Sequence, residues 1–313
     1  MDMCDNVVVR KYQNMNSERL TNLLRETFGG SRDPCDADGN CIVKTPTENS
    51  MSTLNQEQVD QFNRDGYLIV RELFDAEEIH LLLSIAKGDQ QLEYQALERL
   101  DLSNGTSKLW ITGSLGEDIY SAFASCNRVV NPIEQLLGDE VYHYHHKVML
   151  KEPFVGGAWE WHQDYGYWYL NGCLFPYMAS CLIAIDRATK ENGCLQVIRG
   201  SHHMGRIDHG KAGGQKGADI ERVNEALNYL ELVQCEMEPG TALFFHCNLL
   251  HRSDANRSPN PRWSLISCYN AARNPCREKP NHPSYQRLEK LPDSKVKEIG
   301  HRQLKVIALG SLR

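Results

Sequence analysis

The chain has 313 residues, of which 41% are hydrophobic and 24% are charged, and its formal net charge is −7. This composition is typical of a globular protein with a sizeable core, and it excludes collagen, a coiled coil and disorder along the whole length. A net negative charge provides no general attraction to nucleic acid or to an anionic membrane. No apolar run reaches the roughly 18 residues that a membrane-spanning helix needs, so we expect neither a nucleic-acid nor a membrane partner.

The eleven cysteines are irregularly spaced and include no Cys-x-x-Cys pair. Cys181, Cys194 and Cys268 lie within apolar segments and are interpreted as small buried side chains. The N-terminus lacks the charged and then apolar pattern of a signal peptide. These features predict a reducing compartment, with a cytoplasmic location as the default. The ending Ser311-Leu312-Arg313 differs from the Ser-Lys-Leu peroxisomal signal, although the peroxisome or another organelle stays open as a destination.

Composition divides the chain into three expected parts. Residues 1–50 are polar and weakly patterned, which predicts a partly ordered N-terminal extension with a short helix at 17–28. Residues 51–275 carry the regular apolar patterns of a folded domain. Residues 276–313 are expected to form a C-terminal tail that packs on this domain and contains a short helix before Gly300.

The main domain is expected to begin with helices. Thr53 with Gln56, and Asp75 with Glu78, have the spacing of capping boxes, and apolar residues at helical intervals follow each pair. Between the two helices, Tyr67-Leu68-Ile69-Val70 predicts a strand. Residues 89–125 are harder to interpret and are expected to form helix and loop.

From about residue 139, short apolar segments alternate with turn signals, which is typical of a β-sandwich or barrel. Residues 141–151 alternate in character and predict a strand, one face of which carries His143, His145, Lys147, Met149 and Lys151. Further strands are expected at 178–186, 194–198, 241–246 and 262–269, a flexible polar loop at 210–217, and a helix at 219–230.

Two short motifs contain possible metal ligands. In the segment Trp161-His162-Gln163-Asp164-Tyr165, an extended backbone would point His162 and Asp164 to the same side. His251 follows about 90 residues later and is preferred to His246, which ends an apolar run and suits the core. Two histidines and one carboxylate form the facial triad of non-haem Fe(II) oxygenases, which leaves positions open for a cosubstrate and dioxygen.

An arginine strengthens this interpretation. Arg262 lies eleven residues after His251, at the start of the apolar segment Arg262–Asn270. A guanidinium in a buried strand is costly unless it pairs with an anion, and its planar fork suits a carboxylate such as the distal one of 2-oxoglutarate. Ser253, two residues after His251, could add a hydroxyl group to the same carboxylate.

The order of these motifs resembles the phytanoyl-CoA dioxygenase superfamily over about residues 53–274. The motifs are His162-x-Asp164, Glu191-Asn192-Gly193-Cys194, Gly200-Ser201-His202, His251 and Arg262. The resemblance implies a mainly β fold with flanking helices, built on a double-stranded β-helix (a jelly-roll, cupin-like core). It also implies Fe(II), 2-oxoglutarate as cosubstrate and O2, with ascorbate as reductant.

The resemblance also assigns roles to residues of this chain. It implies that His162, Asp164 and His251 are the iron ligands and that Arg262 and Ser253 hold 2-oxoglutarate. His145 and Lys147 fall where the superfamily places further cosubstrate contacts. The expected product is a hydroxylated metabolite, because the metal carboxylate is present.

Two stretches, 161–168 and 256–270, look like ectoine hydroxylase within the superfamily. The acidic, methionine-rich segment of that enzyme is replaced here by residues 169–177, so the substrate is expected to differ. Trp168, Tyr165 and Arg206 are the candidate substrate contacts. The aromatic residues at 165–169 are expected to alternate faces along an extended segment, and the polar loop at 202–217 is expected to act as a lid.

The sequence thus predicts an Fe(II)- and 2-oxoglutarate-dependent dioxygenase that hydroxylates an unactivated C–H bond of a small polar metabolite. Three alternatives remain: a metal-binding barrel without turnover that acts as a sensor or scaffold, an oxygenase acting on an acyl-CoA ester, and a zinc hydrolase on the same barrel. The oligomeric state stays open.

Overall fold

The computed structural model describes residues 53–101, 103–212, 215–276 and 285–310, which belong to one compact unit, Asn49–Arg313. The helix predicted at 17–28 lies outside the described residues. The three-part division of the chain stays a prediction.

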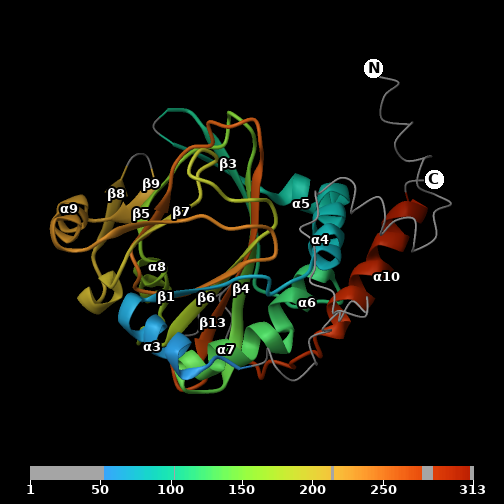
Figure 1. Cartoon of the computed structure of the whole chain (residues 1–313), viewed down its shortest axis with the longest axis horizontal. Coiled ribbons are helices and arrows are strands. Elements are labelled where there is room, and N and C mark those ends of the chain that lie inside the picture. The colour runs from blue at the N-terminus through green and yellow to red at the C-terminus, as the bar shows by residue number, and fades with distance from the viewer. Residues whose placement is uncertain (1–52, 102, 213–214, 277–284, 311–313) are drawn as a thin grey trace, which may run out of the picture. The chain divides into compact units, whose positions relative to one another are not determined.

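Two antiparallel sheets face each other across the core (Figure 1). The large sheet has the order β1 (Tyr67–Val70), β11 (Ala242–His246), β6 (Met178–Ala184), β13 (Arg262–Ala271), β4 (Val141–Lys151), β3 (Thr106–Thr112) and β2 (Leu97–Leu100). The small sheet has the order β10 (Leu232–Cys235), β7 (Leu195–Ile198), β12 (His251–Ser253) and β5 (Trp159–His162). This sheet-rich arrangement confirms the predicted jelly-roll core with flanking helices.

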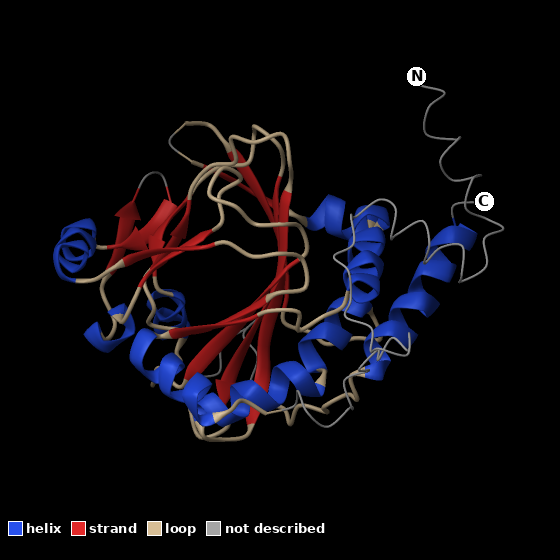
Figure 2. Cartoon of the chain, viewed as in Figure 1, coloured by secondary structure: helices blue, strands red, loops and turns tan. Residues whose placement is uncertain are grey.

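Helices cover the outer side of the large sheet (Figure 2). They are α3 (Gln56–Asp65), α4 (Ala76–Gly88), α5 (Gln90–Gln95), α6 (Ile119–Ser125), α7 (Asn127–Leu137) and α10 (Ser294–Gly310). Their apolar side chains form one buried cluster with outward-facing strand residues such as Val148, Phe244 and Leu265. Three further helical elements are α8 (Asp164–Asn171), the 3-10 helix η1 (Ser201–Met204) and α9 (Ile220–Tyr229).

The capping boxes were predicted correctly at one helix and displaced at the other. Asp75 and Glu78 exchange side-chain and backbone hydrogen bonds at the start of α4, as expected. At α3 the reciprocal pair is Asn55 with Gln58 and not Thr53 with Gln56. Both pairs have the spacing that the motif requires. The residue at which the helix begins decides which pair forms the capping box.

Two strand pairs occupy segments in which no strand was predicted. β2 and β3 lie within residues 89–125, and β8 (His209–Ala212) pairs with β9 (Gln215–Ala218) where a flexible loop was expected. All four residues of β2 are exposed, and β8 is a short polar segment. Neither segment therefore carries the apolar alternation by which a strand is found in a sequence.

A bulge in β4 changes the predicted faces of that strand. The pairing with β13 shifts between Cys268 and Tyr269, which lie opposite His145 and His143 respectively. The extra residue turns His143 to the helix-covered face, where its Nε2 lies 3.0 Å from Nδ1 of His146. The prediction that His143 shares a face with His145 was therefore wrong, because a bulge reverses the alternation on one side of it.

Among the described residues, no helix is both long and apolar enough to cross a membrane.

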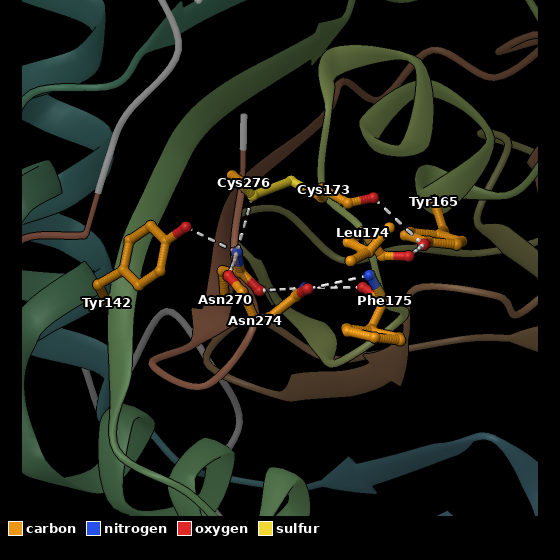
Figure 3. Close-up of a disulfide and its surroundings, with 8 residues drawn as sticks. All are labelled: Tyr142, Tyr165, Cys173, Leu174, Phe175, Asn270, Asn274 and Cys276. Carbon is orange, nitrogen blue, oxygen red and sulfur yellow. Dashed lines mark hydrogen bonds between the residues drawn. A yellow bond between two sulfur atoms is a disulfide. The ribbon is translucent and has the colours of Figure 1, made fainter. Parts of the chain in front are cut away.

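A disulfide joins Cys173, just after α8, to Cys276, just after β13 (Figure 3). The amide of Asn274 reinforces this junction, because its Nδ2 donates to the Phe175 carbonyl (2.7 Å) and its Oδ1 accepts from the Phe175 N–H (2.9 Å). This disulfide does not agree with the reducing compartment that the sequence predicted. Six other cysteines in the described ranges are buried and free, including the three that were predicted to be core residues.

The disulfide closes a loop of 103 residues in sequence separation. A loop of this length restricts the unfolded chain, so we expect Cys276→Ser to lower the free energy of unfolding by about 2–4 kcal/mol. Denaturant unfolding with and without a dithiol reductant measures this difference. Reductant should destabilise the wild type and leave the variant unchanged. Rapid alkylation of both thiols in native protein purified without reductant would contradict the bond.

Candidate metal centre

Two strands of the small sheet bring the predicted histidines together. β12 pairs with β5 so that His251 lies opposite His162, and their ring centroids are 4.0 Å apart. The carboxylate of Asp164 completes the cluster, in which one ligand atom from each residue lies within 4.8 Å of the others. All three side chains are buried, with exposed fractions of 6%, 3% and 4% for His162, Asp164 and His251.

The backbone that presents Asp164 differs from the prediction. His162 ends β5, Gln163 has extended torsion angles (φ −115°, ψ 135°), and Asp164 is the first residue of α8. A strand-to-helix turn, and not a continuous extended segment, therefore places the two ligands together. For the same reason Tyr165, Trp168 and their neighbours follow a helical and not an alternating arrangement.

Backbone carbonyls orient both imidazoles. Nδ1 of His162 lies 2.8 Å from the Glu160 carbonyl, and Nδ1 of His251 lies 2.9 Å from the Leu249 carbonyl. Because each Nδ1 donates its proton there, each Nε2 keeps a free lone pair for a metal. Burial lowers the pKa of both rings below its usual value, so both are neutral near pH 7.

The carboxylate of Asp164 is held in its ionised form. Its Oδ2 accepts a hydrogen bond from the Ser180 hydroxyl (3.1 Å), and its Oδ1 lies 3.7 Å from Nζ of Lys147. Burial alone would raise the pKa of Asp164, but the positive charge of Lys147 is the main electrostatic effect that outweighs it and holds that pKa below its usual range. Two neutral imidazoles and one carboxylate form a donor set that fits Fe(II).

His246, the competing candidate, lies outside this cluster. Its Nδ1 accepts the N–H of Asn248 (3.0 Å), and its ring packs near Phe62 and His202. It is a partly buried, hydrogen-bonded histidine outside the metal cluster, and His251 takes the third position, as the sequence favoured.

Two buried cations lie side by side farther along the barrel. Arg262 pairs in register with Lys151 between β13 and β4, and their exposed fractions are 4% and 0%. Nη1 of Arg262 is 3.4 Å from the Ser264 hydroxyl, and Nζ of Lys151 donates to the Ser253 hydroxyl (2.9 Å) and to the Asp254 carbonyl. Among the described residues neither cation forms an ion pair, and Nε of Arg262 has no hydrogen-bond partner.

The two positive charges destabilise each other without an anion. Burial lowers the pKa of Arg262 to about 10. Burial and then the charge of Arg262 lower the pKa of Lys151 well below its usual value. A carboxylate between them would satisfy both groups, so this pocket is a candidate anion site.

Lys151 was missed as a site residue, although the sequence contained a signal for it. It stands on the same strand face as Lys147, and the argument that a buried cation needs an anion applies to it as it does to Arg262. Ser180 was also missed, because nothing in its segment of small and apolar residues marks it as a partner of Asp164.

The other candidate residues take different positions. His145 is partly buried, its buried Nε2 has no hydrogen-bond partner among the described residues, and its ring meets Trp168 edge to face (5.8 Å). The Tyr165 hydroxyl donates to the carbonyls of Cys173 (3.2 Å) and Leu174 (2.7 Å), so it is committed to the loop after α8 (Figure 3).

Arg206 lies in the loop between η1 and β8, and its side chain is 30% exposed. It pairs with Asp208 (2.7 Å), and its guanidinium stacks over the Tyr169 ring at 4.5 Å.

Comparisons with known proteins agree with this geometry. The family described as phytanoyl-CoA dioxygenase (PhyH) matches residues 62–264. Ectoine dioxygenase of Sphingopyxis alaskensis is 29% identical over 239 residues, covering 71% of this chain and 77% of that protein. L-proline trans-4-hydroxylase of Streptomyces griseoviridis is 28% identical over 241 residues, covering 71% and 87%.

Solved structures give the same result. EctD from S. alaskensis with 2-oxoglutarate and 5-hydroxyectoine superposes with a TM-score of 0.62 at 25% identity, covering 81% of this chain and 93% of that one. EctD with bound Fe gives a TM-score of 0.61 at 25% identity, covering 78% and 90%. The predicted enzyme class, a 2-oxoglutarate-dependent dioxygenase, is confirmed, and the chain belongs to the phytanoyl-CoA dioxygenase (PhyH) family.

Proposed function

We propose that this protein hydroxylates a C–H bond of a small polar metabolite, with Fe(II) held by Nε2 of His162, Nε2 of His251 and the carboxylate of Asp164. One observation carries the proposal. The His-Asp-His cluster shares the barrel with a buried, unpaired Arg262, and the enzyme class needs both a metal and a dicarboxylate. A zinc hydrolase would use the three metal ligands but gives no reason for the arginine.

The remaining polar groups take supporting roles in this proposal. Arg262, Lys151 and Ser253 bind the distal carboxylate of 2-oxoglutarate, whose negative charge offsets the repulsion between the two cations. Lys147 lies beside Asp164 and contacts the end of 2-oxoglutarate nearer the metal. His145 keeps a free ring nitrogen on the same side of β4 and adds a further cosubstrate contact. Trp168 packs against Tyr144 (5.4 Å) and His145, and so gives the pocket an apolar wall.

When bound, Fe(II) with 2-oxoglutarate and dioxygen supplies the oxidant for hydroxylation, and ascorbate keeps the metal reduced. The chain itself has three tasks: it keeps both imidazoles neutral, it holds the cosubstrate by its far end, and it limits access of water to the centre. The burial of all three ligands serves the last task.

The proposed substrate class rests on the named relatives and on the position of Arg206. Relatives of this chain are named for ectoine, L-proline and methylphosphonate, all of which are small and polar. In this proposal Arg206 leaves Asp208 and meets a negative group of such a substrate. An acyl-CoA ester and a barrel without turnover remain the alternatives. The net charge of −7 disfavours a nucleic-acid partner.

A cytoplasmic location also remains a proposal. Its test is the thiol state of Cys173 and Cys276 in protein alkylated at the moment of lysis, because a reducing cytosol would compete with this disulfide.

The first test is succinate release from 2-oxoglutarate by purified protein with Fe(II) and ascorbate, with a panel of small amino acids, betaines and acyl-CoA esters. We expect the wild type to release succinate and one class of the panel to accelerate it. Arg262→Ala should raise the KM for 2-oxoglutarate by about 30-fold or more, since a buried charged hydrogen-bond partner is worth at least about 2 kcal/mol. Metal binding without succinate release under every condition would instead favour the barrel without turnover.

Asp164→Ala should abolish turnover while the protein stays folded, because the metal loses its only carboxylate. The loss of activity should exceed the about 10- to 100-fold typical of residues that only orient metal ligands. Asp219→Ala removes a carboxylate that caps α9, and it should lower the melting temperature slightly with full activity. Full activity in Asp164→Ala would refute the assignment.

Lys151→Met should raise the KM for 2-oxoglutarate with little change in kcat, because Lys151 lies beside Arg262 and contacts the cosubstrate only at its far end. Methionine matches the length of the lysine chain without its charge, and it removes the repulsion with Arg262. We therefore expect unfolding stability to stay equal or rise without 2-oxoglutarate. An unchanged KM would show that Arg262 alone recognises the carboxylate.

A further inference from the structure

Gln163 stands between two of the proposed metal ligands, and its side chain has no exposed surface. A glutamine that is fully buried must satisfy two N–H donors and one carbonyl acceptor within the protein. It therefore matters which groups its carboxamide meets.

All three hydrogen bonds of the carboxamide go to backbone groups of two other segments. Nε2 donates to the carbonyls of Gly205 (2.8 Å) and Asn248 (2.7 Å), and Oε1 accepts the N–H of Ile207 (2.7 Å). One segment is the loop after η1. The other is the turn that leads into His251.

The turn before His251 is thereby tied to the first two ligands. Asn248, whose carbonyl Gln163 holds, is followed by Leu249, whose carbonyl orients the His251 ring. The N–H of Tyr165 reaches the same turn at the Cys247 carbonyl (2.9 Å). The ligand segment therefore holds the turn at two adjacent residues.

His209, at the end of this loop and the start of β8, also bonds the backbone of Gln163. The Gln163 N–H donates to Nε2 of His209 (3.0 Å). Nδ1 of His209 in turn donates to the Ile207 carbonyl (2.9 Å). The His209 ring lies against Gly166 so closely that a Cβ there would be 2.1 Å from its Cε1. Only glycine allows α8 to approach His209 in this way.

We propose that Gln163 is a positioning residue that holds the His162–Asp164 segment in register with His251 and with the loop 205–209, so that the three ligands form one preorganised metal site. The inference rests on the proposed metal centre. The contacts also fix the loop that carries Arg206, so this part of the predicted lid is anchored to the metal segment.

Gln163→Met tests this role, because methionine has a similar length and volume but can form none of the three hydrogen bonds. Gln135→Met is the control for the loss of a carboxamide that bonds the backbone: Gln135 is exposed, and it bonds the N–H (2.8 Å) and the carbonyl (2.9 Å) of Leu54 on the helical side. The measurements are anaerobic Fe(II) affinity, the visible spectrum of the Co(II)-loaded protein, which reports ligand geometry, and the melting temperature.

We expect Gln163→Met to bind Fe(II) and Co(II) about 10- to 100-fold more weakly than the wild type, as when other partners of metal ligands are removed. Its Co(II) spectrum should change, whereas Gln135→Met should keep wild-type affinity and spectrum at a reduced melting temperature. At saturating Fe(II), the KM of Gln163→Met for 2-oxoglutarate should stay near the wild-type value, because Arg262 and Lys151 are untouched.

Wild-type metal affinity and spectrum in Gln163→Met, with only a lower melting temperature, would overturn the positioning role. Absence of metal binding in the wild type itself would instead overturn the metal centre on which it rests. If Gln163→Met does not fold, Gln163→Ser replaces it, because the vacated space lets water reach the three backbone groups. Undiminished metal affinity in that variant would equally overturn the proposal.

Discussion

The pairing of β12 with β5 is the constraint on which the site depends. It sets His251 opposite His162 and brings residues about 90 positions apart within reach of one ion. Antiparallel register moves in steps of one residue, and a slip by one would turn one histidine to the other face of the sheet. Carbonyls two residues before each histidine then fix the ring, so local backbone geometry and long-range pairing together define the ligand directions.

Buried charge explains the arrangement of the barrel interior. The large sheet contributes three cations, Lys147, Lys151 and Arg262, to the barrel interior. The carboxylate of Asp164 lies beside Lys147. Lys147 is neutralised by that carboxylate, whereas Lys151 and Arg262 face each other at a cost in free energy. The folded protein therefore keeps a charge imbalance that a dicarboxylate relieves. In the proposed function, this imbalance is the physical basis for recognising 2-oxoglutarate.

Contacts at both ends of α8 hold the segments that carry the proposed metal ligands. At its start, Gln163 and Tyr165 bond the turn before His251, and at its end the disulfide and Asn274 tie the following loop to the segment after β13. Because β13 also carries Arg262, the proposed metal site and anion site share one rigid frame. These contacts favour a preorganised centre, because the side chains need little rearrangement when the metal and the cosubstrate bind.

The sequence by itself determined the chemistry of the site and the class of the fold. The types and order of His162, Asp164, His251 and Arg262 indicate a metal and a carboxylate, because these preferences belong to the side chains themselves. Strands with strong apolar patterns, such as β4, β11 and β13, were placed within a few residues for the same local reason. What only the tertiary structure decided depends on contacts between distant segments: the bulge that turns His143 outward, the start of α8 at Asp164, the Cys173–Cys276 bond and the bonds of Gln163. A bulge, a helix start and a buried hydrogen bond are chosen by the partner that lies across the fold, and that partner is absent from any local stretch of sequence.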